Sequence, residues 1–396
     1  MIALDLDLTE PLVHARADMA EFWRIQRRHR PIFWQPGTAA ASGFWVVCGY
    51  HAAAGIYRDH VRFTSQRGNV LLTLLAGGDS AAGDMLAVTD PPRHTVLRRL
   101  LTPALSRKAL CALANPIRDR TRRLLSDRVG TGPFDFAREV ASRILIYTIC
   151  DLLGIAERDH ELLVTLTKQA LGSEDAAQPR IDAMAARQEI LLCLLELVQE
   201  QRRQPAGGLV SALIAETFEG APLTDDQIVT NCYSMILGGD ETSRLILTNT
   251  AQAFVADPSL WDAFGEVTDL PTAVEEILRC FAPTMHFGRV ARTDVELPGA
   301  DIAAGDIVTL WNISANRDES RFPSPDTVRF DRKPNPHLSF GFGPHHCVGA
   351  HLARLEIGIV LDELRGVTRV IRPAGTPRPL YSNFLHGYAT LPIELA

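Results

Sequence analysis

The stretch Phe340-Gly341-Phe342-Gly343-Pro344-His345-His346-Cys347-Val348-Gly349 decides the fold, and an apolar-periodic helix is predicted directly after it, over 349–365. The glycines let the backbone turn tightly and approach a flat ligand closely. Cys347 stands at the predicted start of the helix, where unpaired N–H groups and the helix dipole favour a thiolate. A thiolate held by amide hydrogen bonds is a good axial ligand for haem iron. The stretch is therefore a candidate haem-thiolate site, with Cys347 as the metal ligand.

A zinc site is the alternative for this stretch. Its candidate ligands are His345, His346, Cys347 and His351. Their spacing matches no common zinc pattern. The seven cysteines of the chain are scattered and form no C-x-x-C motif, and we expect the other six to be buried and inert. Scattered cysteines in odd number also argue against a disulfide framework and favour a reducing, cytoplasmic compartment.

The composition is that of an ordinary globular protein. The chain has 396 residues, a formal net charge of −7, 46% hydrophobic residues and 22% charged residues. This is enough apolar side chain for a large core and too much for a disordered chain. The mild acidity argues against a nucleic-acid partner, which would require a basic stripe. Residues 1–7 carry acids where a secretory signal carries Lys or Arg, and no apolar run is long enough to cross a bilayer, so no membrane attachment is expected.

Helical periodicity dominates the middle of the chain. Apolar residues recur at intervals of three and four, which predicts helices over 93–101, 105–127, 134–154, 159–172, 180–203, 208–216 and 225–256. The remaining pattern predicts β-type runs at 44–49 and across 286–311, a coil over 321–337, and one or two β-hairpins over 377–396. The expected fold class is mainly α with a small β portion, in a single domain over 1–396.

The stretch quoted first resembles the haem-ligand loop of the cytochrome P450 family, F-G-x-G-x-H-x-C-x-G, with every fixed position filled. Further motifs match in the order of the family, so the resemblance covers nearly the whole chain. It implies the cytochrome P450 fold, in which haem b (iron protoporphyrin IX) is buried between two long helices. It also implies that Cys347 binds the iron and that Gly349 is one of the cofactor-binding residues.

Two glycines, two acids and two alcohols stand inside the predicted helix 225–256, as Gly238-Gly239-Asp240-Glu241-Thr242-Ser243. Glycine inside a helix costs about 1 kcal/mol relative to Ala, so a ligand that uses the free space would explain the pair. The segment resembles the family's A-G-x-[DE]-T-[TS], with Gly238 in place of the usual Ala. This implies that Glu241 and Thr242 are catalytic and deliver protons to the reacting dioxygen. A kinked helix with solvated acids is the alternative.

The family's contacts to the haem propionates have counterparts in this chain. His94 and Arg98 follow Asp90-Pro91-Pro92 and share one helical face at i and i+4, which resembles the family's H-x-x-x-R. Arg289 matches the strand arginine with the same role, and His345 matches the histidine of the haem loop. The resemblance implies that these residues converge on two carboxylates, as charge complementarity favours.

Glu276 and Arg279 match the family's E-x-x-R, a structural pair. They lie three residues apart on a predicted helix and can pair across one face. In the family this buried pair anchors the coil beneath the haem. The resemblance implies that Arg329 or Arg332 joins it, from the segment 328–337.

The resemblance implies a cytochrome P450 monooxygenase, an oxidoreductase that uses dioxygen and two electrons to hydroxylate its substrate. The chain has no flavin or dinucleotide fingerprint, so a ferredoxin and a ferredoxin reductase are the expected electron donors. Basic residues on the Cys347 side form the expected docking face, namely Arg99, Arg107, Lys108 and Arg354. A non-catalytic haem-binding or recruitment module is the alternative of another class. Such a module should lack the axial cysteine or the acid–alcohol pair, and this chain has both.

Family topology implies a substrate pocket lined by residues near 66–86, 165–182, 234–242, 284–288 and 383–387. The candidate contacts are Leu237, Gly238, Met285 and His286. His286 either supplies a polar contact to the substrate or is a strand histidine bonded to the backbone.

Within the family, local strings resemble enzymes that hydroxylate amino acids tethered to carrier proteins of nonribosomal peptide synthetases. The strings are Ser42-Gly43-Phe44-Trp45, residues 238–244, Met285-His286 with Arg289, and Lys333-Pro334-Asn335-Pro336-His337. The expected substrate is a secondary-metabolite precursor, with an aminoacyl group on a carrier protein as its leading form. A free small molecule and oxidative phenol coupling are the alternatives.

Overall fold

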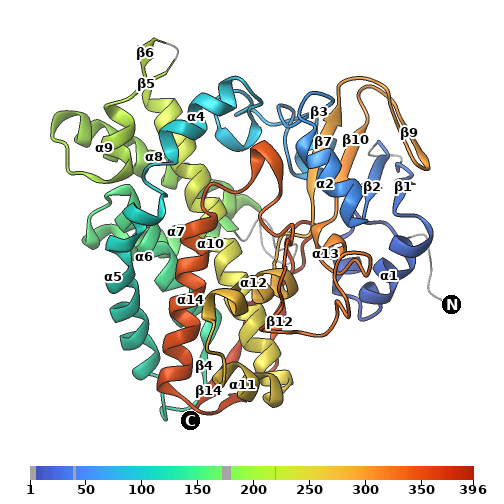
Figure 1. The fold of residues 1–396 in the computed structure, drawn as a ribbon. Helices are drawn as coiled ribbons and strands as arrows, with labels where there is room; N and C mark the ends of the chain where they lie inside the picture. Colours follow the sequence, from blue (N-terminus) through green and yellow to red (C-terminus); the bar gives the residue numbers. More distant parts are fainter. Residues whose placement is uncertain (1–5, 39–41, 172–179, 219) are drawn as a thin grey trace.

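Helices dominate the computed structural model, which describes residues 6–38, 42–171, 180–218 and 220–396 (Figure 1). They are α1 (Met19–His29), α2 (Tyr50–Arg58), α3 (Leu71–Leu75), α4 (Arg93–Leu101), α5 (Arg107–Ser126), α6 (Ser142–Leu153), α7 (His160–Leu171), α8 (Arg180–Arg203), α9 (Gly208–Ile214), α10 (Asp225–Ala256), α11 (Pro258–Gly265), α12 (Leu270–Phe281), α13 (Asn312–Ala315) and α14 (Ala350–Val367). The expected fold class, mainly α with a small β portion, is confirmed.

The strands gather beside the helical part. They are β1 (Ile32–Gln35), β2 (Phe44–Val47), β3 (Phe63–Thr64), β4 (Phe134–Asp135), β5 (Thr217–Phe218), β6 (Ala221–Pro222), β7 (Phe287–Ala291), β8 (Val295–Leu297), β9 (Ala300–Ile302), β10 (Ile307–Leu310), β11 (Ile371–Pro373), β12 (Arg378–Pro379), β13 (Tyr388–Thr390) and β14 (Pro392–Leu395). The largest sheet has the order β1-β2-β10-β7-β3, with β10 parallel to β2 and antiparallel to β7. Figure 1 shows this sheet with α1, α2 and α13 on one side of the molecule.

The long helix α10 runs through the helical part, and α14 lies against it (Figure 1). Its start is set by a capping box, in which the Thr224 hydroxyl accepts from the Gln227 N–H and the Gln227 side chain accepts from the Thr224 N–H. The middle of α10 is buried in two apolar clusters shared with α6, α8 and α14. Burial on most sides explains why its apolar stripe is broad rather than narrow.

The expected helix over 134–154 is wrong in its first turns. Phe134 and Asp135 form β4, which pairs with β14 of the tail, and a π-helical turn over Ala137–Ala141 precedes α6. The Ser142 hydroxyl donates to the Ala137 carbonyl at 3.0 Å within this turn. The partner strand lies at the far end of the chain, so local periodicity carries no sign of the pairing.

The tail forms one of the expected hairpins. β12 and β13 pair antiparallel, whereas β14 pairs with β11 and β4. The proline-rich segment 321–337 holds no helix or strand, as expected. Residue 172, the expected end of one helix, lies outside the described residues. In the part of the chain that the structure describes, no helix is long and apolar enough to span a membrane.

Candidate haem site

The glycine loop before α14 is pressed against α2. A Cβ added at Gly343 would lie 2.6 Å from the Tyr57 carbonyl oxygen, and the φ of Gly343 is +72°, so only glycine fits there. The loop is closed by the Cys347 N–H, which donates to the Phe340 carbonyl at 2.9 Å. This places Cys347 three residues before α14 begins.

Cys347 is accessible although protein surrounds it. Its side chain is exposed, yet burial within the surrounding protein raises the pKa of its thiol. The Gly349 N–H and the nearby Arg98 guanidinium act in the opposite direction and lower that pKa, but burial dominates. Burial therefore opposes the thiolate, whereas the amide hydrogen bond at the helix start favours it. Binding of a cationic metal centre is what deprotonates such a thiol.

Arg98 and Arg289 are cations that pair with no carboxylate in the described part of the chain. Arg289 is buried on β7 and donates to the Gly288 carbonyl at 2.7 Å, and the half-buried Arg98 of α4 donates to the His346 carbonyl at 2.6 Å. Within residues 6–38, 42–171, 180–218 and 220–396, neither guanidinium forms an ion pair with a carboxylate. Buried charge without a counter-charge is costly. Two carboxylates of a ligand beside Cys347 would supply the missing charge, so these residues fit haem.

His94 and His345 lie together near these arginines. Their ring centroids are 4.3 Å apart, and burial, with the nearby charge of His345, lowers the pKa of His94 to about 4. His345 Nε2 lies 3.3 Å from a carboxylate oxygen of Asp90. The structure thus brings together all the predicted propionate contacts and adds Asp90, to which no role was assigned from the sequence. Its position before two prolines at a helix start was the available signal.

The helix α10 stays α-helical throughout 225–256, and the two acids of the segment, Asp240 and Glu241, are buried rather than solvated. Gly239 packs closely against α6, because an added Cβ would lie 2.8 Å from Ile149 Cδ1 and the end of that side chain would have to shift. Gly238 is exposed, and an added Cβ would meet nothing within 4 Å. Gly238 therefore leaves one side of α10 open, and the kinked-helix alternative is not supported.

Thr242 and Glu241 are both engaged in local contacts. The Thr242 hydroxyl donates to the Gly238 carbonyl at 2.6 Å. The buried Glu241 carboxylate forms a two-point ion pair with Arg244, which also donates to the Tyr388 carbonyl at 3.2 Å. No role was predicted for Arg244 from the sequence, although a cation three residues after an acid predicts such a pair.

Asp240 is buried next to this pair without a cation of its own. Its Oδ1 has no hydrogen-bond partner among the described residues. Burial and the neighbouring Glu241 charge raise the pKa of Asp240 to about 7. The side chain is therefore protonated in a large fraction of molecules near neutral pH.

The expected pocket residues separate into two groups. Leu237 is half-buried and Gly238 exposed, so α10 offers both to an internal ligand. Met285 and His286 are fully buried in the aromatic core on the sheet side. The prediction that they contact the substrate is therefore wrong. The His286 ring stacks on Trp311 with centroids 4.6 Å apart, and neither ring nitrogen has a partner among the described residues. The backbone-bonded alternative for His286 is also not supported. Burial lowers the pKa of His286 to about 3.

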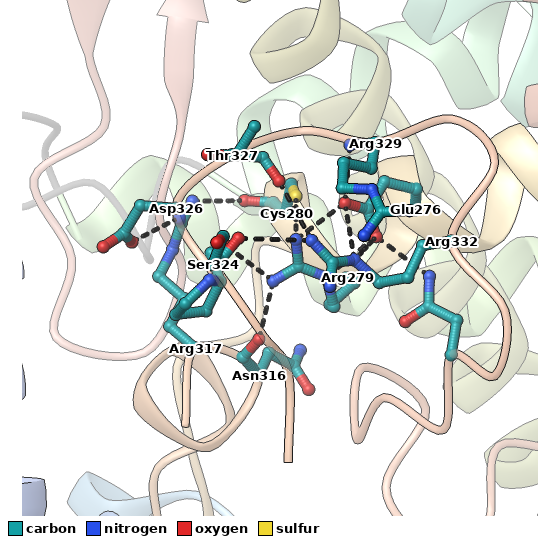
Figure 2. A network of polar contacts seen from close by, with 12 residues as sticks. Glu276, Arg279, Cys280, Asn316, Arg317, Ser324, Asp326, Thr327, Arg329 and Arg332 are labelled. Carbon is teal, nitrogen blue, oxygen red and sulfur yellow. Dashed lines mark hydrogen bonds and ion pairs between the residues drawn. The ribbon is translucent and has the colours of Figure 1, made fainter. Parts of the chain in front are cut away.

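The Glu276–Arg279 ion pair is present and fully buried, with contacts of 2.7 and 2.8 Å (Figure 2). The Arg332 side chain donates to the Glu276 carboxylate at 3.0 Å, whereas Arg329 donates to it through its backbone N–H at 2.9 Å. Arg279 also donates to the carbonyls of residues 316 and 325. The network thereby ties the 321–337 coil to α12.

The side chains around Cys347 do not support the zinc alternative. Among the described residues, no three His, Cys, Asp or Glu side chains are grouped so as to hold a metal ion.

Arg354, expected on the docking face, is paired with Glu275 at 2.5 and 2.9 Å.

Known proteins resemble the chain along its whole length. The cytochrome P450 family model matches residues 255–364. Cytochrome P450 NovI of Streptomyces niveus is 39% identical over 392 residues, which cover 98% of this chain and 96% of that protein. The chain belongs to the cytochrome P450 family. A methyl-branched lipid omega-hydroxylase of Mycobacterium tuberculosis strain H37Rv is 32% identical over 407 residues, covering 97% of this P450 and 95% of the hydroxylase.

Solved P450 structures match the fold. The crystal structure of P450 OxyD, which is involved in the biosynthesis of vancomycin-type antibiotics, has a TM-score of 0.90 at 32% identity and covers 99% of both chains. A Mycobacterium marinum cytochrome P450 in complex with pseudoionone has a TM-score of 0.89 at 27% identity, covering 98% of both chains. The expected fold, the monooxygenase class and the haem b cofactor are confirmed at the level of the family.

Proposed function

We propose that this P450 hydroxylates a secondary-metabolite precursor and that Cys347 is the axial ligand of its haem iron. The observation that carries the assignment is the pair of guanidinium groups of Arg98 and Arg289, which have no acidic partner in the described part of the chain and accompany the accessible Cys347. When bound, haem supplies the oxidative chemistry that no side chain can perform. The chain supplies the ligand, the counter-charges and the control of protons.

Each part of the site has a defined task in this proposal. Arg98 and Arg289 bind the propionates, assisted by His94 and His345. The Gly349 N–H bonds the Cys347 sulfur and so modulates its electron donation.

Glu241 and Thr242 manage the proton supply. Thr242 lies next to the open side of α10 that Gly238 creates, so its hydroxyl is the group that meets the reacting oxygen. Glu241 is held by Arg244 and exchanges a proton only after leaving that pair. The ion pair therefore limits how fast protons reach Thr242.

A haem analogue tests the proposed propionate contacts. Apoprotein is titrated with haem and with haem dimethyl ester, which lacks the two carboxylates. We expect the ester to bind at least about tenfold more weakly, because two charge-assisted contacts are lost. Equal affinities would show that Arg98 and Arg289 do not bind propionates. Arg123→Gln, on the exposed far end of α5, is the matched control and should change neither affinity.

We propose a ferredoxin with its reductase as the electron donor, docking beside the α4–α5 turn. Arg99, Arg107 and Lys108 are exposed there, around a surface hollow of about 550 Å³ lined by Thr95, Val96, Arg98, Arg99, Thr102, Pro103 and Ser106. Arg354 contributes less, because Glu275 neutralises it. Arg99→Glu and Arg107→Glu should slow reduction by ferredoxin and weaken its salt dependence, whereas Arg123→Glu should not. Unchanged reduction rates in both variants would exclude this docking face.

We further propose an aminoacyl group tethered to a carrier protein as the leading substrate form. The support is the likeness to P450 OxyD together with the local strings that resemble carrier-dependent hydroxylases. A spin-state titration compares free amino acids with the same amino acids loaded on a carrier protein. A spectral shift with loaded carrier alone supports the proposal. A shift with free compounds alone favours a free small molecule as substrate.

A further inference from the structure

Asp90 is a buried carboxylate that is held by three different parts of the fold. One oxygen, Oδ1, accepts from the Ser65 N–H at 3.1 Å and lies 3.3 Å from His345 Nε2. The other, Oδ2, accepts from the Thr64 hydroxyl and from Arg292 Nη2, the latter at 2.7 Å. The side chain is 1% exposed. A carboxylate held at this many points cannot turn without breaking several hydrogen bonds.

These contacts join segments that are distant in sequence. Thr64 belongs to β3, Arg292 directly follows β7, and His345 lies in the glycine loop. The Asp90 carbonyl also accepts from the His94 N–H at 3.0 Å, at the start of α4. Asp90 therefore fixes both the backbone of His94 and the ring of His345. The centroids of the two histidine rings are 4.3 Å apart.

The charges around Asp90 divide into two sets. Arg292, with a side chain 43% exposed, pairs with Asp90 from the solvent side, while Arg98 and Arg289 donate to backbone carbonyls and have no ion pair with an acid among the described residues. Burial opposes ionisation of Asp90, but hydrogen bonds led by the one to His345 outweigh it and hold the pKa of Asp90 well below its usual range. Asp90 forms no ion pair with Arg98 or Arg289 among the described residues, although its charge acts on Arg289 and partly offsets the lowering of the Arg289 pKa by burial.

We infer that Asp90 is a positioning residue for the cofactor, which holds the His345 imidazole at the edge where a haem propionate binds, with Arg292 holding Asp90 from outside. This inference rests on the proposed haem site. Loss of either Asp90 or Arg292 should loosen the His345 ring in the same way, although the two side chains carry opposite charges. That difference separates positioning from a purely electrostatic effect.

The test measures haem retention and reduction potential in the holoenzyme. Asp90→Asn, Arg292→Gln and the double variant are compared for the rate of haem transfer to apomyoglobin and for the midpoint potential. Both single variants should release haem about tenfold faster, since a charge-assisted contact is lost in each. The double variant should be less than additive, because the residues act as one unit. The midpoint potential should rise in Asp90→Asn and fall in Arg292→Gln, following the charge that is removed.

Asp306→Asn is the matched control. Asp306 accepts from the Trp45 indole at 2.9 Å in the same sheet region and does not touch the glycine loop. It should leave both readouts unchanged. Asp90→Glu keeps the charge and displaces it, so it should retain the potential of the wild type but still release haem faster, which covers the case in which Asp90→Asn does not fold. Opposite shifts in potential with unchanged haem release would overturn the positioning role. Failure of the wild type itself to retain haem would instead overturn the haem site.

Discussion

Thr242 and Thr250 make the same hydrogen bond on α10 but face different surroundings. Each hydroxyl donates to the carbonyl four residues earlier, at 2.6 Å for Thr242 and 2.7 Å for Thr250. Thr250 is fully buried, whereas Thr242 lies beside the open surface of Gly238. The difference in exposure, rather than the hydrogen bond, makes Thr242 the candidate for proton transfer.

Substitution of Thr242 by Ala should uncouple electron consumption from product formation. The hydroxyl that passes protons is lost, so we expect the product formed per electron pair to fall about tenfold or more. The measurement compares the number of electron pairs consumed with the amount of product formed. Thr250→Ala, which removes an equivalent hydroxyl from the same helix, should keep normal coupling. Unchanged coupling in Thr242→Ala would exclude the relay role.

Asp240 should impose a pH dependence on stability. Its pKa is about 7 in the folded protein against 3.8 for the model compound, so the folded state binds more protons between these values. Stability from this group is full below about pH 4 and is lost as the pH rises through about 7. Relative to Asp240→Asn, the wild type should therefore lose on the order of a few kcal/mol across that window.

The measurement for Asp240 is the free energy of unfolding by urea at several pH values for wild type and Asp240→Asn. Asp226→Asn, an exposed acid in the first turn of the same helix, is the control. A constant difference between wild type and Asp240→Asn across the window would contradict the assignment.

Single residues were predictable where a motif named them. Arg98, Arg289 and His345 could be placed from spacing and resemblance. Asp90 could not, because its partners come from β3, the glycine loop and the end of β7, which are adjacent only after folding. His286 was misplaced, since its ring turns into the aromatic core around Trp311 rather than toward a ligand.

Among the elements, the 321–337 coil depends on α12 for its position. Glu276 accepts from the side chains of Arg279, Arg332 and Asn335 and from one backbone N–H. It is the only carboxylate that these two buried arginines share in the part of the chain that the structure describes. The coil has no helix or strand of its own, so this network replaces secondary structure as its support.

Glu276→Gln should strongly destabilise the protein. The change keeps the size of the side chain but leaves Arg279 and Arg332 buried without a counter-charge, so we expect a loss of about 3–5 kcal/mol. Glu275→Gln, at the partly exposed neighbour that pairs with Arg354, should cost about 1 kcal/mol or less. Urea unfolding of both variants gives the comparison. Equal losses would show that burial of the network does not control stability.

Helix positions were predictable because their apolar period is local. The helices over 93–101 and 225–256 match α4 and α10 at both ends, and the helix over 180–203 matches α8 at its C-terminal end. The first turns of 134–154 were not predictable, because β4 forms only by pairing with β14. Strand order in the main sheet was equally hidden, since β2 and β10 are joined only by tertiary contact.

At the scale of the whole molecule, the candidate site draws on both sides of the fold. Arg98 comes from α4, Arg289 from β7, Thr242 from α10, and Cys347 from the loop before α14. We propose on this ground that the chain acts as a single domain. Calorimetry of the holoenzyme should then give one cooperative transition, whose midpoint falls when haem is removed because a ligand of the folded state is lost. Two separate transitions would contradict the single domain.

The central claim is that Cys347 binds haem iron as a thiolate. The most direct measurement is the absorption spectrum of the reduced protein with carbon monoxide, recorded for wild type and for Cys347→Ala. The account predicts a strongly red-shifted Soret band in the wild type, typical of thiolate-ligated haem, and its loss in Cys347→Ala. A wild-type Soret band at the position of histidine-ligated haem proteins, or a red-shifted band that persists in Cys347→Ala, would contradict it.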